Sequence, residues 1–271
     1  MAVCSCWQSA AWRTASEEDS SLKSKIHAGE KVLGMFLSEI GAPNLVRLMQ
    51  ASGVDFVIVD CEHGYFDFSQ VAAIAAVGSG IGFPVIVRVP HISRECVQKY
   101  LDAGVDGLLV PMLETKEQAE MLVRLGKYAP EGVRGISTMR PHSNYNPGDL
   151  VAYTEKANKR TMFFAQIESR KGVQNADAIA SVPGLDGVFI GPNDLACDMG
   201  QTGRFNTPEM DSAIGHVVEA ARKNHIPCGI IASNTAFLRK WEERGMTMFS
   251  CDSELGLLKK GIQSMVKNVN G

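Results

Sequence analysis

Short, almost wholly apolar runs recur along the chain, and each is followed by a stretch in which apolar residues have helical spacing. Strands that are buried on both faces are apolar nearly throughout, so these runs predict the buried strands of a parallel sheet. Glycine or proline marks many of the junctions, as at Gly104, Gly184 and Pro227. The predicted strands are residues 31–38, 55–61, 83–89, 106–112, 162–168, 186–192, 227–233 and 247–252.

Strand and helix alternate eight times, which predicts an α/β fold of the closed (β/α)₈, or TIM barrel, type. A doubly wound open sheet is the alternative, but the first predicted strand is not followed by a Gly-x-Gly-x-x-Gly fingerprint. Residues 22–271 are expected to form this single domain. The connection 129–160 is long for a barrel, and we expect it to cover the active site or to contact another subunit.

Residues 1–21 differ in character from the rest of the chain, with several serines and a late acidic run. They lack the positive start and sustained apolar core of a secretory signal. We predict a disordered extension, with a mitochondrial presequence as the alternative.

Composition narrows the classes of function. The chain has 271 residues, 45% hydrophobic and 21% charged, with a formal net charge of −3, so nucleic acid or an anionic membrane is not an expected partner. No apolar run approaches the roughly 20 residues needed to span a bilayer. Seven cysteines are scattered without a CxxC pair, which favours a reduced, cytoplasmic protein.

Charged and polar side chains collect where four of the predicted strands end. The carboxyl ends of barrel strands meet at one face, which carries catalysis. One such residue can be explained as a helix cap or an ion pair, but several on the same face cost stability unless they pair or bind something. An active site is therefore predicted there. Its residues are Asp60, Glu62 and His63 after the second strand, Arg88 at the third, Gln166 and Glu168 at the fifth, and Asp194 after the sixth.

These residue types suit a bound metal and a chelating, anionic substrate. Glu168 and Asp194 are one strand–helix–strand step apart, so their carboxylates should converge as hard oxygen ligands for Mg²⁺ or Mn²⁺. An arginine on the same rim suits a carboxylate or an enolate oxygen. A histidine beside an aspartate, as in His63 and Asp60, suits acid–base catalysis. The predicted strands carry no interior lysine for a Schiff base, so a metal is expected to activate the carbonyl.

Several segments together resemble the HpcH/HpaI family. They are "FVIVDCEHG", "PVIVRVP", "LDAGVDGLLVPMLETKEQAE", "KYAPEGVRG" and "AQIESRKGVQNADAIASVPGLDGVFIGPNDL", and the resemblance runs in order from about residue 30 to the C-terminus. Members of this family are metal-dependent class II pyruvate aldolases with a (β/α)₈ barrel. The resemblance implies the same fold and type of enzyme for this chain.

The resemblance also implies roles for individual residues. Glu168 and Asp194 would bind the divalent metal (Mg²⁺ or Mn²⁺, with Co²⁺ as a further option), and that metal would chelate pyruvate. Arg88 would face the keto or enolate oxygen, and Asp60 and His63 would hold a water-linked base. The pyruvate site would also be lined by Gln166, Gly191, Pro192 and Asn193.

Assembly is implied in the same way. Asp102 in "YLDAG" matches a residue that reaches a neighbouring subunit's site in a trimer, and the last helix is often exchanged between barrels to give hexamers. A homotrimer or homohexamer is therefore expected.

The chain departs from the family pattern at several positions. Phe36 lies near the place of a tryptophan on the first strand, the end of the last strand reads "SCDSELG" where Gly-Ser-Asp is commoner, and Asn193 stands where alanine is frequent. The segment 136–150 is also unusual. These positions bear on the aldehyde side of the site, so the acceptor aldehyde is not predicted.

The leading hypothesis is an aldolase that reversibly cleaves a 2-keto-3-deoxy sugar acid or a 4-hydroxy-2-oxo acid to pyruvate and an aldehyde through a metal-bound pyruvate enolate. Decarboxylation of oxaloacetate, or a macrophomate synthase-like reaction, would use the same enolate. A citramalyl- or malyl-CoA lyase would need a basic groove, for which the sequence offers no Lys/Arg cluster. A non-catalytic barrel is disfavoured by the complete set of site residues.

Overall fold

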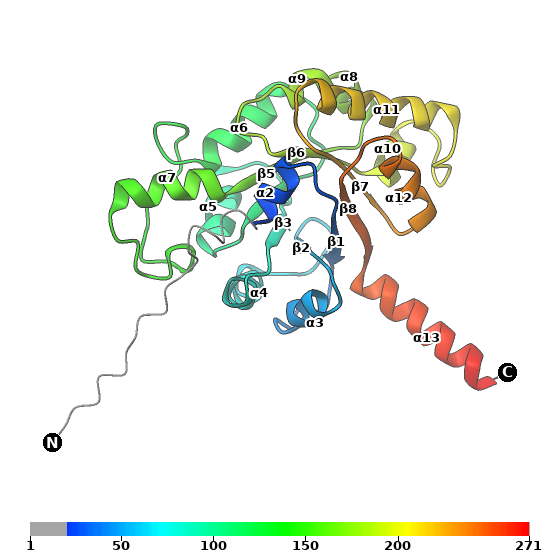
Figure 1. The fold of residues 1–271 in the computed structure, drawn as a ribbon, viewed down its shortest axis with the longest axis horizontal. Coiled ribbons are helices and arrows are strands. Elements are labelled where there is room, and N and C mark those ends of the chain that lie inside the picture. Colours follow the sequence, from blue (N-terminus) through cyan, green and yellow to red (C-terminus); the bar gives the residue numbers. More distant parts are fainter. Residues whose placement is uncertain (1–20, 271) are drawn as a thin grey trace.

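The computed structural model describes residues 21–270, in which eight parallel strands close into one barrel in chain order (Figure 1). This confirms the (β/α)₈ prediction, and the open-sheet alternative is wrong. The predicted extension lies outside the described residues except for Ser21, whose side chain caps the first helix. The strands are β1 (Val32–Leu37), β2 (Phe56–Asp60), β3 (Val85–Arg88), β4 (Gly107–Val110), β5 (Met162–Ile167), β6 (Gly187–Ile190), β7 (Cys228–Ala232) and β8 (Met248–Ser253).

Helices follow the strands around the outside of the barrel. The long connection 129–160 contains a short 3₁₀ helix and a full α-helix, so it is only partly a loop. The helices are α2 (Leu22–His27), α3 (Leu45–Ala51), α4 (Phe68–Ile81), α5 (Arg94–Asp102), α6 (Lys116–Gly126), η1 (Pro141–Ser143), α7 (Leu150–Arg160), α8 (Arg170–Gln174), α9 (Ala176–Ala180), α10 (Pro192–Asp198), α11 (Pro208–Lys223), α12 (Thr235–Glu242) and α13 (Glu254–Asn270).

Alternate residues of each strand pack into two separate apolar clusters. One cluster joins the strands to the surrounding helices and includes Val57, Val59 and Val87. The other contains Phe56 and Ile58, together with the corresponding residues of other strands, and fills the barrel interior. Because side chains alternate along a strand, Asp60, Arg88 and Gln166 continue the inward-facing rows at the carboxyl end.

At the opposite end of the barrel, aspartates that precede β2, β4 and β6 link neighbouring strands through hydrogen bonds. The carboxylates of Asp55, Asp106 and Asp186 accept the backbone N–H groups of Leu33, Val85 and Phe163 at 2.9, 3.0 and 2.9 Å. The aspartate before each of these three strands thus binds the strand to its predecessor in the chain.

Helix α2 covers this amino end of the barrel. Its Leu22 and Ile26 belong to the interior cluster and are 6% and 1% exposed. Lys23 and His27 hold the helix in place through contacts with the Asp186 carboxylate at 2.8 and 3.0 Å. The sequence pattern does not predict this helix.

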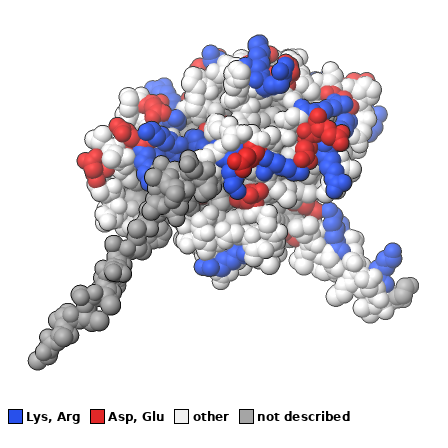
Figure 2. All heavy atoms as spheres, viewed as in Figure 1, with Lys and Arg blue, Asp and Glu red and all other residues white. Residues whose placement is uncertain are grey.

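The last helix, α13, extends away from the barrel (Figure 1, red). Charges of both signs are interspersed on the face of the barrel shown in Figure 2, whereas the projecting helix is largely uncharged between a few basic side chains. Within residues 21–270, the helices are too short or too polar to cross a membrane.

Candidate active site

Asp60 and Arg88 form a buried ion pair across neighbouring strands. They are direct register partners in β2 and β3 and are 4% and 8% exposed. Arg88 Nε and Nη2 donate to the two carboxylate oxygens of Asp60 at 3.0 and 2.6 Å, which is the bidentate geometry of a strong charge-assisted pair. Burial alone would raise the pKa of Asp60, but the hydrogen bonds and charge of Arg88, with two backbone N–H groups, hold this pKa below its usual value.

The guanidinium of Arg88 is also restrained on its face and on its outer edge. Its Cζ lies 4.8 Å from the centre of the Phe36 ring on β1, a cation–π contact. Its Nη1 lies 3.3 Å from the Glu62 carboxylate. The arginine is therefore held in one orientation by side chains from three elements.

Glu168, which follows β5, is a buried acid with a strongly shifted pKa. It is 2% exposed, and burial raises its pKa to about 7. Hydrogen bonds from the Gln166 side chain and from Met112 N, the latter at 2.7 Å, oppose this rise, while the charges of Asp194 and Glu62 add to it. The three carboxylates therefore lie within electrostatic range of one another.

Gly191 allows the backbone after β6 to approach Glu168. A Cβ atom at this position would lie 2.1 Å from Glu168 Oε2 and 3.1 Å from Gln166 Nε2. Any larger residue would displace the carboxylate, so glycine is required by the close approach. Pro192 then opens α10, and the exposed Asn193 and Asp194 lie in its first turn.

The donors at this end of the barrel fit a hard divalent cation. Glu168 and Asp194 supply carboxylate oxygens, and their mutual repulsion is of the kind that a cation relieves. The buried side-chain oxygen of Gln166 has no hydrogen-bond partner within the described part of the chain. Among residues 21–270, no group of three or more His, Cys, Asp or Glu could hold a metal; the predicted site has two such ligands.

His63 lies differently from the simple Asp–His pair that the sequence suggested. Its backbone N–H donates to Asp60 Oδ1 at 3.2 Å, so the two residues are joined through the main chain. The imidazole is 68% exposed, and its Nε2 lies 3.9 Å from the Glu62 carboxylate. Asp60 thus shapes the turn that carries His63, while Glu62 lies nearest to the ring among the described acids.

Asp102 is not brought together with the other predicted residues. It ends α5, which runs from the carboxyl end of β3 back toward the amino end of the barrel. Its carboxylate accepts from Arg134 Nη2 at 2.8 Å and lies 3.5 Å from His142 Nε2.

Three contacts in the site were not assigned from the sequence. From the sequence, Phe36 is only a departure from the family pattern, Glu62 is one of the charged residues after the second strand with no stated partner, and no role is assigned to Met112. Met112 acts through its backbone, which has a φ of 47°, unusual for a residue with a side chain, and which directs its N–H toward Glu168. Residue type carries no signal for such a main-chain role.

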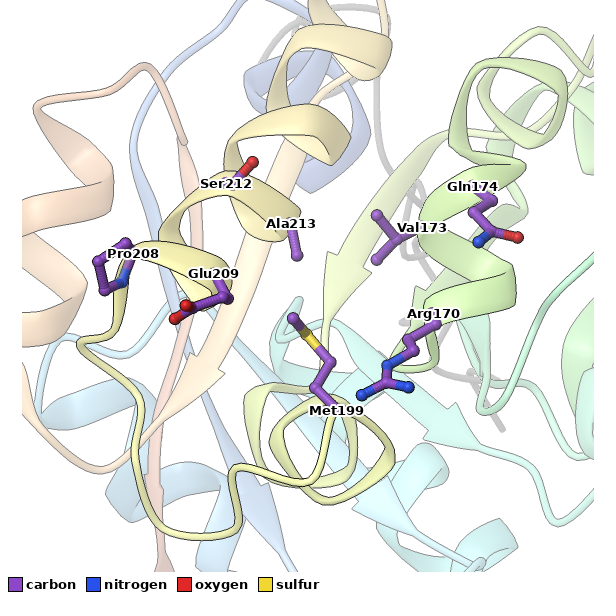
Figure 3. Close-up of a pocket in the computed structure, with 8 residues that line it drawn as sticks. All are labelled: Arg170, Val173, Gln174, Met199, Pro208, Glu209, Ser212 and Ala213. Carbon is purple, nitrogen blue, oxygen red and sulfur yellow. The ribbon is translucent and has the colours of Figure 1, made fainter.

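A separate surface hollow of about 500 Å³ lies between α8, the end of α10 and α11 (Figure 3). Its lining includes the apolar residues Val173, Met199 and Ala213 and the charged residues Arg170 and Glu209. None of the predicted site residues lines it.

Comparisons with known proteins give one consistent result. The family model described as HpcH/HpaI aldolase/citrate lyase matches residues 33–260. The 5-keto-4-deoxy-D-glucarate aldolase of Escherichia coli O9:H4 (strain HS) is 32% identical over 246 residues, covering 91% of this chain and 95% of the relative.

Solved structures are also similar to this chain. The HpcH/HpaI aldolase from Desulfitobacterium hafniense DCB-2 has a TM-score of 0.88 and 32% identity, covering 92% of this chain and 96% of that one. Macrophomate synthase has a TM-score of 0.80 and 25% identity, covering 95% and 97%.

Proposed function

Because the chain belongs to the HpcH/HpaI aldolase/citrate lyase family, we propose that it is a metal-dependent carbon–carbon lyase. It reversibly cleaves a 2-keto-3-deoxy sugar acid, or a 4-hydroxy-2-oxo acid, to pyruvate and an aldehyde. Similarity along most of the chain to a 5-keto-4-deoxy-D-glucarate aldolase favours a substrate of that kind.

One observation carries this proposal: the buried Glu168, with its pKa raised to about 7, lies in electrostatic range of Asp194 and Arg88. A buried acid next to like charges is costly in a protein that does not use it. A divalent cation such as Mg²⁺, Mn²⁺ or Co²⁺ held by Glu168 and Asp194 would supply a Lewis acid that polarises the 2-oxo group of the substrate. Gln166 and the backbone of Gly191, Pro192 and Asn193 would line the space for pyruvate.

Arg88 is the residue that we assign to the developing negative charge. Nε and Nη2 are bound to Asp60, and Nη1 lies 3.3 Å from the Glu62 carboxylate. Nη1 carries two N–H groups, so one of them would remain to meet the former keto oxygen. A donor that is already fixed in orientation costs little reorganisation when the enolate forms. Phe36 and Glu62, which contact the guanidinium, would keep it so.

Cleavage also needs a base. The proton on the C4 hydroxyl is removed, the C3–C4 bond breaks, and its electron pair passes to the 2-oxo group to give the enolate of pyruvate. We assign proton transfer to His63 acting through a water molecule, because imidazole exchanges protons near neutral pH. Asp60 would support it by fixing the turn from residue 60 to residue 64.

The test is aldol addition of pyruvate to a panel of aldehydes before and after chelation. We expect chelation to abolish turnover and Mn²⁺, Mg²⁺ or Co²⁺ to restore it. Borohydride with pyruvate should leave no adduct. A trapped pyruvyl-lysine, or full turnover without metal, would contradict the proposal.

A second candidate is decarboxylation of oxaloacetate, or a macrophomate synthase-like addition, which needs the same enolate. The structural similarity to macrophomate synthase over 95% of the chain favours it. Product analysis with oxaloacetate alone, compared with pyruvate plus aldehydes, separates the two reactions.

We also propose a homotrimer or homohexamer in which Asp102 reaches the site of a neighbouring subunit. The projecting α13 supports assembly, since large apolar side chains stay exposed along it, and such faces mark protein interfaces. We expect light scattering to give a trimer or hexamer and Asp102→Ala to lower turnover; a fully active monomer would contradict both. The exposed residues are Leu257, Leu258, Ile262, Met265, Val266 and Val269.

We propose a cytoplasmic location because the cysteines are not paired in disulfides within the described residues. The five within the described residues are free thiols, as expected for a reducing compartment. They are Cys61, Cys96, Cys197, Cys228 and Cys251.

A further inference from the structure

Glu254, the first residue of α13, is a buried acid bound to the turn that follows β1. It is 7% exposed. Three consecutive backbone N–H groups donate to its carboxylate: Ser38 N to both oxygens at 2.8 and 2.9 Å, and Glu39 N and Ile40 N to Oε1 at 2.7 and 3.2 Å. A carboxylate that accepts several main-chain hydrogen bonds fixes the conformation of that main chain.

The turn held by Glu254 lies against the turn that carries His63. A Cβ atom placed on Gly64 would lie 2.5 Å from the Ser38 carbonyl oxygen and 2.2 Å from that of Asp60. The two turns are thus in backbone contact, and glycine is needed at residue 64 to allow it. Two residues before Ser38, Phe36 stacks on Arg88.

We propose that Glu254 is a positioning residue for the reaction. It holds residues 38–40 against residues 60–64, and in this way it fixes the turn that presents Glu62 and His63 to the substrate. Glu254 itself touches neither the substrate nor the predicted metal ligands. The inference rests on the proposed function and adds to it a residue from the far end of the chain.

Asp186 provides a matched control at the other end of the barrel. It is also buried, at 3% exposed, and it also binds a backbone N–H, that of Phe163. Its neighbours are Lys23 and His27 of α2. Loss of this carboxylate should affect folding in a similar way without reaching the catalytic turns.

The first experiment measures steady-state aldol addition of pyruvate, below the melting temperature of every variant. We expect Glu254→Gln to lower kcat by about 10- to 100-fold, since a small misplacement of a catalytic group has an effect of this size. KM for pyruvate should change less than about twofold, because Arg88 keeps its pair with Asp60. Glu254→Asp, which keeps a carboxylate, should lose less, and Asp186→Asn should keep normal kcat. Equal losses in Glu254→Gln and Asp186→Asn, or unchanged kcat in Glu254→Gln, would overturn the proposal.

The second experiment separates Glu254 from the assignment of the base. If Glu254 acts through the turn 60–64, then Glu254→Gln in a His63→Ala background should change kcat less than about twofold; independent multiplication of the two losses would contradict the proposal. Full turnover in His63→Ala alone would instead refute the assigned base. In that case hydrogen exchange decides: faster exchange at residues 38–40 and 61–64 in Glu254→Gln, but not in Asp186→Asn, supports the positioning role, and unchanged exchange overturns it.

Discussion

The two ends of the barrel both bury a carboxylate, but they surround it differently. At the amino end, Asp186 accepts a backbone N–H and lies within 3.0 Å of the cationic or ionisable groups of Lys23 and His27. At the carboxyl end, Glu168 is equally buried, yet within residues 21–270 it forms no ion pair with Lys, Arg or His. Arg88 lies within electrostatic range of it, but the charges of Asp194 and Glu62 add to the rise in its pKa.

We interpret this difference as that between an acid with a structural role, Asp186, and an acid with the proposed functional role, Glu168. Asp186 contacts Lys23 and His27 of the chain itself, and these contacts hold α2 over the amino end of the barrel. For Glu168, burial and the like charges nearby make the ionised form unfavourable. Together they raise its pKa to about 7. A cation from outside the chain would remove that cost, so we propose that the carboxyl end of the barrel binds one.

The largest expected effect at the carboxyl end is that of Arg88→Ala. Removing one preorganised donor for an oxyanion typically lowers kcat by about 10²–10³, roughly 3–4 kcal/mol. Both aldol cleavage and oxaloacetate decarboxylation should be lost together, while metal binding is kept. Arg88→Lys should not restore activity fully, since the bidentate contact with Asp60 needs the planar fork.

If Arg88 only pairs with Asp60, the substitution should instead lower thermal stability and leave turnover nearly normal. Kinetics and melting of the same metal-loaded Arg88→Ala protein distinguish the two roles.

A medium effect is expected in the pH dependence of stability. The pKa of Glu168 is raised from 4.5 to about 7 on folding, so its favourable contribution is complete below pH 4.5 and is lost as the pH rises through 7. Without metal, the wild-type protein should lose about 3 kcal/mol relative to Glu168→Gln between pH 4.5 and pH 8. Added Mn²⁺ should remove most of that loss, as melting curves at several pH values would report; a pH-independent difference would be inconsistent with this account.

The smallest effect is expected at the amino end. Ile26→Val removes one methylene from a residue that is 1% exposed, and it should lower the free energy of unfolding by about 1 kcal/mol. Because this residue lies at the end of the barrel opposite the proposed active site, kcat should be unchanged. A fall in kcat at a temperature where the variant is fully folded would show that the two ends are not independent.

The sequence predicts much of this molecule, for reasons that are local. Eight apolar runs with regular connections are sufficient for the barrel, and strand alternation is sufficient to turn Asp60, Arg88 and Gln166 inward at the same end. The match of the family model to residues 33–260 confirms the family that the motifs indicated.

The features of the site and fold that could not be predicted from the sequence depend on contacts between distant segments. The orientation of the His63 ring depends on how the turn 60–64 packs. The hydrogen bond from Ser38 N to the Glu254 carboxylate joins residues 216 positions apart. The short helix α2 is stabilised by the barrel that it covers, so its own six residues give little periodicity to read.

We expect Glu168 to be a metal ligand and Asp186 not to be one, although both are buried acids. Calorimetric titration of Mn²⁺ into the folded wild-type, Glu168→Gln and Asp186→Asn proteins at pH 8 tests it directly. We expect one binding event with the same Kd in wild type and Asp186→Asn, and loss of that event in Glu168→Gln. Unchanged Mn²⁺ binding by a folded Glu168→Gln protein would contradict it.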